Sequence, residues 1–475
     1  MFEKSVTGQF GITDKLEDLI NGTLMLDEFG NVKLELNNSF SETIADSFNE
    51  IQNCVEFPKI IGYGSNGKYY ELINCWSTGG NLNLGGLIQP KVYYTCEFVY
   101  EFPQNYSKED SFDRISFSID KLNQWCNIPS LKVNNIMHPT NVEFDIQTLW
   151  QQAKDDLEFK IGSGYKTSGE ENCNYSVSFD YAFTIKFEPQ KLLDVDIDKF
   201  IRIAVDFKTM LSLFVNESAK IYNITITNTK STVSINLYCN YVQQNTEKSI
   251  DARKRISTFY LNDISKNLMA IFDCFKEKQE SLGGSLSAIL KNCDLKKHRV
   301  IDIPDYIKQT ATAIEGFMRN CRNLTIEEDQ NIFKERLERL LENQTNDDAK
   351  WLKERLKYAN QASFRKQLKL LFEEFRNNFK EHTKGILDDK KLENQIIDGY
   401  VNTRNFFTHY DMATKKIMLK NDTLVFLCGY INELLRLLIL KEIGIDSEIV
   451  TKRNSHNQLL IGTKSRLLEC LKGEK

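Results

Sequence analysis

The N-terminal half alternates apolar and polar positions in short runs, a pattern typical of β-strands that bury one face. Residues 22–36 and 59–76 each contain two such runs around a Gly-containing turn, so each predicts a β-hairpin. Runs rich in aromatic and β-branched residues predict further strands at 91–102, 114–119, 157–161, 176–187 and 222–238. A mixed apolar pattern predicts one inserted helix at 192–216. Residues 1–255 therefore predict a β-rich antiparallel domain that is sandwich-like or barrel-like.

From about residue 261 onward, apolar residues recur at three- and four-residue steps, which predicts helices. The predicted helices are 262–279, 305–320, 327–342, 347–380, 391–411 and 421–443. Gly283 and Gly284 are predicted to end the first helical run. A buried seam is expected along the two charged helices, at Leu337, Leu340, Leu341, Leu368, Leu370, Leu371, Phe372 and Phe375. The fold class is therefore α+β multidomain, with a helical connector and linker at 256–304 and an all-α bundle at 305–475.

Composition places the chain among globular proteins of two or three domains. It has 475 residues, of which 41% are hydrophobic and 27% charged. No apolar run approaches the ~18 residues of a membrane span, and no basic segment leads into an apolar leader, so we expect no membrane association. The eleven cysteines are scattered without a Cys-x-x-Cys pair, which favours reduced thiols in a cytoplasmic protein and argues against a zinc site.

The net charge of −5 excludes a protein that coats nucleic acid with a large positive surface. If RNA is a partner, its contacts must be local and transient.

One stretch, GYVNTRNFFTHYD at 399–411, combines an arginine, an amide and a histidine that could carry a reaction. Because it contains no internal Gly or Pro beyond its first residue, it predicts a helix on which Asn405 and His409 lie one turn apart, with Arg404 beside them. Phe406 and Phe407, together with Tyr410, are expected to anchor this helix in a core.

Two other segments fit a loose Arg-Asn-to-His pattern, so the spacing alone is weak evidence. They are FRNNFKEH, with Arg376, Asn377 and His382, and KRNSH, with Arg453, Asn454 and His456. The first is charged on most sides, as a solvated helix face would be, and the second is too tightly spaced to share one helix edge.

A family resemblance favours the stretch at 399–411. Together with the apolar helix after it and LKEIGI at 440–445, it resembles the C-terminal domain of ApeA-like proteins, antiphage defence proteins of the HEPN superfamily. The early hairpins and RISFSIDKLNQWCNI at 114–128 resemble the N-terminal domain of the same family. The resemblance implies a HEPN bundle at 305–475 and a metal-independent endoribonuclease without a cofactor, with Arg404, Asn405 and His409 as catalytic residues.

The residue types suit those roles. Arginine keeps its charge and can bond two phosphate oxygens, and histidine can carry protons near neutral pH. We expect Arg404 to bind the phosphate, His409 to transfer protons, and Asn405 to position the ribose, phosphate or imidazole. The resemblance also implies a homodimer that pairs two motif helices in one composite site. Glu315 matches an acidic residue that HEPN domains often place near the active arginine, but it could equally be a surface partner of Arg319.

The implied function is abortive infection: the β-rich half senses an unknown phage-derived trigger and the helical half cleaves RNA. One alternative is a non-catalytic binding protein with a β-rich ligand-recognition domain and a helical dimerisation domain. Another is a partner of a nucleotidyltransferase, in which the motif region would be modified.

Overall fold

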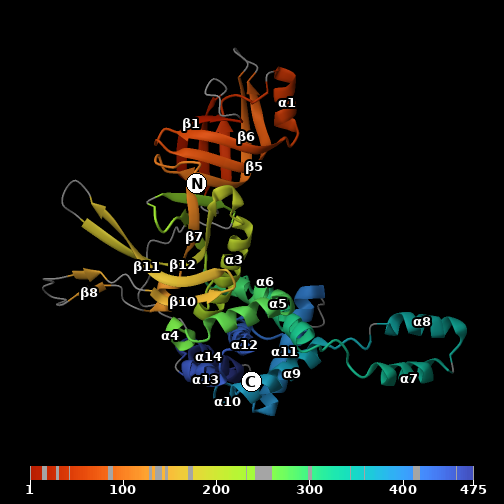
Figure 1. Cartoon of the computed structure of the whole chain (residues 1–475). Helices are drawn as coiled ribbons and strands as arrows, with labels where there is room; N and C mark the ends of the chain where they lie inside the picture. The colour runs from red at the N-terminus through yellow and green to blue at the C-terminus, as the bar shows by residue number, and fades with distance from the viewer. Residues whose placement is uncertain are drawn as a thin grey trace. The chain divides into compact units, whose positions relative to one another are not determined.

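The computed structural model describes most of the chain, which divides into two compact units (Figure 1). The described residues are 2–12, 19–27, 31–41, 43–83, 89–127, 131–133, 142–144, 148–169, 175–231, 233–240, 259–297, 302–342, 344–357, 359–409, 418–455 and 457–473. The first unit comprises Met1–Leu211 and Ala219–Arg255, and the second comprises Ser212–Ser218 and Ile256–Lys475. The segment 256–304, which we expected to be a connector, belongs to the second unit.

The first unit begins with a closed antiparallel barrel. Its strands are β1 (Phe2–Gly11), β2 (Ile20–Asp27), β3 (Val32–Leu36), β4 (Glu56–Gly64), β5 (Tyr69–Asn83) and β6 (Gln89–Phe102), with α1 (Ile44–Gln52) packed on β5 and β6. The order is β6-β3-β2-β1-β4-β5, and pairing of β5 with β6 closes the ring. Both predicted hairpins are confirmed, as β2–β3 and β4–β5. Gly67 in the second turn has φ +74°, a conformation that glycine adopts without strain.

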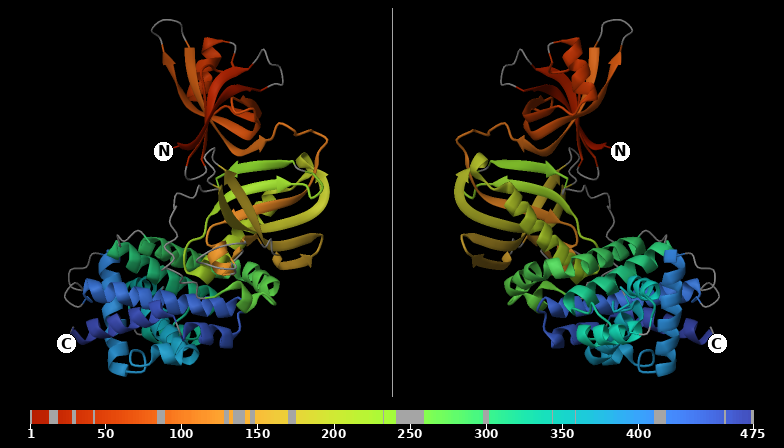
Figure 2. Two further views of the ribbon diagram at one scale, coloured as in Figure 1. Left: turned by 90° about the vertical axis from the view of Figure 1, so that its left-hand side faces the viewer. Right: turned by 90° about the vertical axis from the view of Figure 1, so that its right-hand side faces the viewer.

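The rest of the first unit is a sheet continuous with β6. Its strands are β7 (Ser111–Ile119), β10 (Thr148–Lys154), β11 (Leu157–Gly169), β12 (Tyr175–Lys191), β13 (Ile221–Thr227) and β14 (Ser234–Cys239), in the order β10-β11-β12-β7-β13-β14 before β6. Shorter elements are α2 (Leu122–Cys126), the β8–β9 pair (Leu131–Val133 and Val142–Phe144) and the 3₁₀ helix η2 (Leu192–Asp194). The predicted inserted helix is confirmed as α3 (Ile197–Val215), which lies against the sheet with Phe207 stacked 4.1 Å from Phe183 (Figure 2).

The second unit is helical. Its elements are α4 (Leu261–Ile264), α5 (Leu268–Lys297), α6 (Ile303–Gly316), the π-helix η3 (Phe317–Cys321), α7 (Gln330–Leu341), α8 (Asn346–Leu356), α9 (Phe364–Asn378), α10 (Lys380–Thr383), α11 (Lys390–His409), α12 (Asn421–Glu442), α13 (Ser447–Asn454) and α14 (Gln458–Gly473). The β-rich N-terminal half and helical C-terminal half confirm the predicted fold class.

The helical core is built around α12. In the described part of the chain α12 is the one helix long and apolar enough to cross a membrane, and 89% of its apolar window is buried inside the protein. Burial on all sides is what the central helix of a bundle requires.

Two helix boundaries differ from prediction. Gly283 and Gly284 do not end a helix, because α5 continues through them. Leu282, Leu286 and Ile289 are buried, and packing of this stretch outweighs the ~1 kcal/mol that each helical glycine costs. The predicted helix at 347–380 is two helices, α8 and α9, separated by a turn that Ser363 ends by capping α9.

The α7–α8 hairpin projects from the helical unit (Figure 1). The structure describes every residue of both helices, and none is buried. The predicted buried seam is confirmed on α9, where Leu368, Leu371, Phe372 and Phe375 are buried. It is wrong for the α7–α8 hairpin, where Leu340 is 51% exposed and Leu337 and Leu341 are half-buried. The reason is that α7 and α8 contact chiefly each other, and two short helices cannot bury three leucine side chains fully.

Candidate functional site

The helix α11 provides a fixed scaffold for the predicted site. Its backbone runs without a break from Lys390 to His409. Tyr400 is fully buried and donates a hydrogen bond to the Ile307 carbonyl oxygen at 3.1 Å, which ties α11 to α6. The Thr403 hydroxyl accepts a hydrogen bond from the Leu419 amide nitrogen at 3.3 Å. These buried contacts lie within one or two turns of Arg404 and hold its backbone.

Arg404 is held on three sides. Its Nη2 donates to Glu315 Oε1 at 2.9 Å, and its Nη1 donates to Asn405 Oδ1 at 3.3 Å. The guanidinium carbon lies 5.4 Å from the centre of the Phe364 ring, within the range of a cation–π contact. The Arg404 side chain remains 27% exposed. The guanidinium is therefore oriented by the protein and still reachable by an anion.

Glu315 makes both of the contacts that the sequence left open. Its Oε1 accepts from Arg404, and its Oε2 lies 3.9 Å from Nη2 of Arg319, four residues along the chain. One carboxylate thus lies between two guanidinium groups from different helical elements. The first contact joins residues 89 positions apart in sequence, so only the fold brings them together.

The remaining motif residues are placed only in part. His409 is the last residue of α11, and its side chain lies outside the described part of the structure, as does Tyr410. Phe406 and Phe407 contact each other edge-to-face with ring centres 5.2 Å apart, but both are only half-buried. The expectation that they anchor α11 in a core is therefore wrong. Buried residues of the preceding turns, Ile396 and Ile397, carry that role together with Tyr400.

The segment FRNNFKEH does not place its arginine and histidine on one helix edge as the 404–409 motif does. Arg376 Nη1 donates to the Leu387 carbonyl oxygen at 3.0 Å and to Glu393 Oε1 at 2.6 Å. The helix α9 ends at Asn378, and Phe379 leaves helical geometry at φ −132°, so Arg376 and His382 do not share a helix edge. Burial lowers the pKa of His382 from its ordinary value.

In the segment KRNSH, Arg453 and Asn454 make contacts that hold the fold together. Arg453 forms an ion pair with Asp263 and lies over the Tyr260 ring at 5.3 Å. Asn454 is buried and donates to the Val450 carbonyl oxygen at 2.6 Å. His456 lies outside the described residues.

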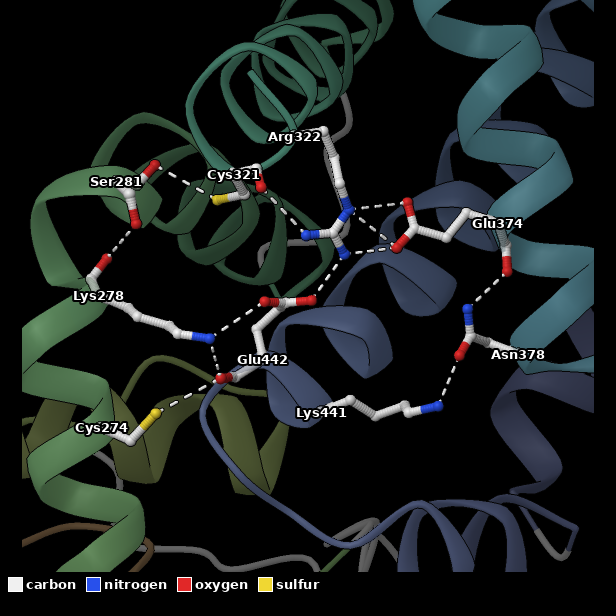
Figure 3. A network of polar contacts seen from close by, with 9 residues as sticks. All are labelled: Cys274, Lys278, Ser281, Cys321, Arg322, Glu374, Asn378, Lys441 and Glu442. Carbon is white, nitrogen blue, oxygen red and sulfur yellow. Dashed lines mark hydrogen bonds and ion pairs between the residues drawn. The ribbon is translucent and has the colours of Figure 1, made fainter. Parts of the chain in front are cut away.

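A polar network that could not be predicted from the sequence links several helices of the second unit, including α9, which also carries Phe364 (Figure 3). Arg322 follows η3 and donates to Glu374 of α9 and to Glu442 of α12, with Nη2–oxygen distances of 2.5 and 2.6 Å. Lys278 of α5 donates to the Glu442 carbonyl oxygen at 2.6 Å. Burial tends to raise the pKa of Glu442, but the bonds and charge of Arg322 and Lys278 outweigh burial and lower that pKa. These charged contacts join α5, α9 and α12 to the residue that follows η3.

Sequence reasoning also missed Phe364. It is the first residue of α9, is buried, and packs on Tyr400 with ring centres 5.8 Å apart. Nothing in its local sequence distinguishes it from a core phenylalanine. In the part of the chain that the structure describes, no three His, Cys, Asp or Glu side chains gather in a group that could hold a metal ion.

Comparison with known families matches both halves of the chain. The family described as ApeA N-terminal domain 1 matches residues 5–275, which is more than half of the 475 residues. The family described as Apea-like HEPN matches residues 309–449, a range that contains Glu315, Phe364 and the whole 404–409 motif. Searches of curated proteins and of solved structures found no match. On the two family matches, this chain belongs to the ApeA-like family of antiphage proteins that carry a C-terminal HEPN domain.

Proposed function

We propose that this protein is a metal-independent endoribonuclease of an abortive-infection system, with Arg404, Asn405 and His409 as its catalytic residues. One observation carries the proposal most. The guanidinium of Arg404 is oriented by Glu315 and Phe364 yet remains partly exposed, five residues before a histidine on the same helix of a HEPN domain.

The proposed reaction needs a base, an acid and a group that stabilises negative charge on the phosphate. The ribose 2′-oxygen attacks the phosphorus while its proton passes to a base, and the bond from phosphorus to the 5′-oxygen breaks as that oxygen takes up a proton. His409 would transfer protons, because an imidazole exchanges them readily near neutral pH. Arg404 would stabilise the charge that grows on the phosphate oxygens. The products would be a 2′,3′-cyclic phosphate and a 5′-hydroxyl.

A homodimer would complete the site. One chain supplies one motif histidine, whereas the reaction uses both a base and an acid. A twofold axis close to α11 would bring Arg404 and His409 of two copies into one cleft. Phe406 and Phe407 support this arrangement, because both are only partly buried and offer some apolar surface on the same helix as Arg404. A monomer that retains full activity would contradict it.

The N-terminal unit would sense a phage-derived trigger of unknown identity, and RNA would be a transient substrate in the cytoplasm without membrane attachment. Net charge of −5 supports transient rather than stable RNA binding.

The test is to express wild type, Arg404→Ala and His409→Ala in cells challenged with phage, and to measure growth and RNA integrity. Arg365→Ala is the matched control, because Arg365 is an exposed arginine that also pairs with a carboxylate, that of Asp398 on α11. We expect RNA loss with wild type and the control and none with the two motif variants. RNA loss or toxicity that survives both motif changes would instead support a non-catalytic binding protein whose helices only dimerise. Intact-mass measurement of the purified chain would reveal modification by a partner nucleotidyltransferase.

A further inference from the structure

Arg319 and Arg404 contact different oxygens of the Glu315 carboxylate. Arg319 Nη2 is 3.9 Å from Glu315 Oε2, the outer limit of an ion pair, whereas Arg404 binds the other oxygen at 2.9 Å. The Arg319 side chain is 49% exposed. Because the local group contains two guanidinium charges and one carboxylate, it retains one positive charge in a chain whose total charge is −5.

The backbone that carries Arg319 is unusual and well fixed. Arg319 lies in η3, a π-helical turn that directly continues α6. Such turns are rare and occur often at functional sites. Phe317 and Met318 are buried on one side of the turn, and the network of Arg322 in Figure 3 holds its end. The exposed Arg319 side chain therefore projects from a rigid base, which limits the entropy lost when it binds a ligand.

We propose that Arg319 binds a second phosphate of the RNA, adjacent to the phosphate bound by Arg404. The inference rests on the proposed function and extends it to the substrate-binding surface. An arginine that is half-exposed and loosely paired loses little when it exchanges a carboxylate for a phosphate, which it can bond bidentately. Because both arginines lie close to the two oxygens of one carboxylate, the two phosphates would be neighbours on one strand.

The experiment measures RNA binding separately from cleavage. Full-length His409→Ala protein is titrated with a labelled single-stranded RNA oligonucleotide at several salt concentrations, with and without Arg319→Gln. We expect Arg319→Gln to weaken binding by about three- to tenfold, since one charge-assisted contact at an exposed position is lost. The slope of log affinity against log salt should become shallower by about 0.7, the share of one phosphate in a single strand. Arg319→Lys should retain much of the affinity and the slope.

Arg336→Gln is the matched control. Arg336 is 58% exposed and pairs with Glu328 at 2.9 Å on the α7 side of the helical unit, so its loss should change neither quantity. In the cleaving protein, Arg319→Gln should raise KM and leave kcat within about twofold, because a contact away from the reacting atoms contributes to binding alone. Affinity and salt slope equal to those of the parent would overturn the proposal, as would a fall in kcat without a change in KM.

The two proposals fail in different ways. If RNA binding depends on Arg319 but the wild type does not cleave, the proposed function is wrong and the second phosphate contact stands. If the wild type cleaves and Arg319→Gln binds RNA with unchanged affinity and slope, only the second contact is wrong.

Discussion

Replacing Arg436 with methionine should strongly destabilise the helical unit. Arg436 and Glu433 are fully buried on α12, and their ion pair joins Nη2 to Oε1 at 2.6 Å. Arg436 Nη1 also donates to the Leu213 carbonyl oxygen at 2.6 Å, near the end of α3. Glu433 accepts from the side-chain amides of Asn216 and Asn457, each at 2.9 Å. The pair thus fixes segment Ser212–Ser218 within the second compact unit.

The magnitude follows from what the single change leaves behind. Glu433 would keep two amide donors but lose its counter-charge, and breaking one side of a buried pair costs about 3–5 kcal/mol. The Leu213 carbonyl would lose its donor, which adds about 1 kcal/mol. Because a folded domain is stable by only about 5–15 kcal/mol, this loss would be a large fraction of the total. The double change Glu433→Gln with Arg436→Met should recover most of it, since replacing both charges is often nearly neutral.

Urea unfolding followed by circular dichroism at the helical signal measures the effect. Arg365→Met is the control, because the Arg365–Asp398 pair is exposed and should contribute no more than about 1 kcal/mol. Arg436→Met within about 1 kcal/mol of wild type would refute the reasoning, as would a double variant no more stable than the single one.

Three further outcomes are expected. Phe364→Leu removes the ring beneath Arg404, and since an exposed cation–π contact is worth about 0.5–1 kcal/mol, single-stranded RNA cleavage should slow about two- to fivefold and recover in Phe364→Trp. Glu442 has a lowered pKa, so its contribution to stability is present above its ordinary pKa of 4.5 and is lost as pH falls through the folded-state value; urea unfolding from pH 7 to 3 should show a weaker acid dependence for Glu442→Gln. Replacing the α7–α8 hairpin with a short glycine linker should leave the thermal midpoint of the helical unit nearly unchanged, because neither helix buries a residue and an isolated β-bridge between Ile326 and Gln361 closes the base.

The fold of the N-terminal half could be predicted from local pattern to a useful extent. The hairpins at 22–36 and 59–76 carry strict alternation and turn residues close together in sequence, so neighbouring residues specify them. The pairings of β6 with β3 and with β14 could not be predicted. Those pairings depend on contacts between distant segments that have no local signature.

The helical half shows the same division. The apolar pattern at 421–443 correctly predicted the helix α12. The prediction that Gly283 and Gly284 end a helix was wrong, because tertiary packing outweighs the weak local preference of glycine against helices. In the candidate site, the motif pointed to Arg404, whose neighbours come from α6 and α9. Phe364 resembles any core aromatic residue in sequence, and Arg319 any surface arginine. The proximity of Phe364 to Arg404 is a property of the fold, whereas helical spacing already indicated that Arg319 could contact Glu315.

The central claim is that Arg404 and His409 form a ribonuclease site, and the chemistry of the cleaved ends tests it most directly. RNA incubated with purified wild-type protein, Arg404→Ala and His409→Ala should be sequenced by methods that distinguish terminal groups. We expect 2′,3′-cyclic phosphate and 5′-hydroxyl ends with wild type. We also expect His409→Ala to cut at least about a hundredfold more slowly, which is the usual contribution of a proton-transfer residue. Equal cutting by wild type and His409→Ala, or 3′-hydroxyl with 5′-phosphate ends, would contradict the central claim.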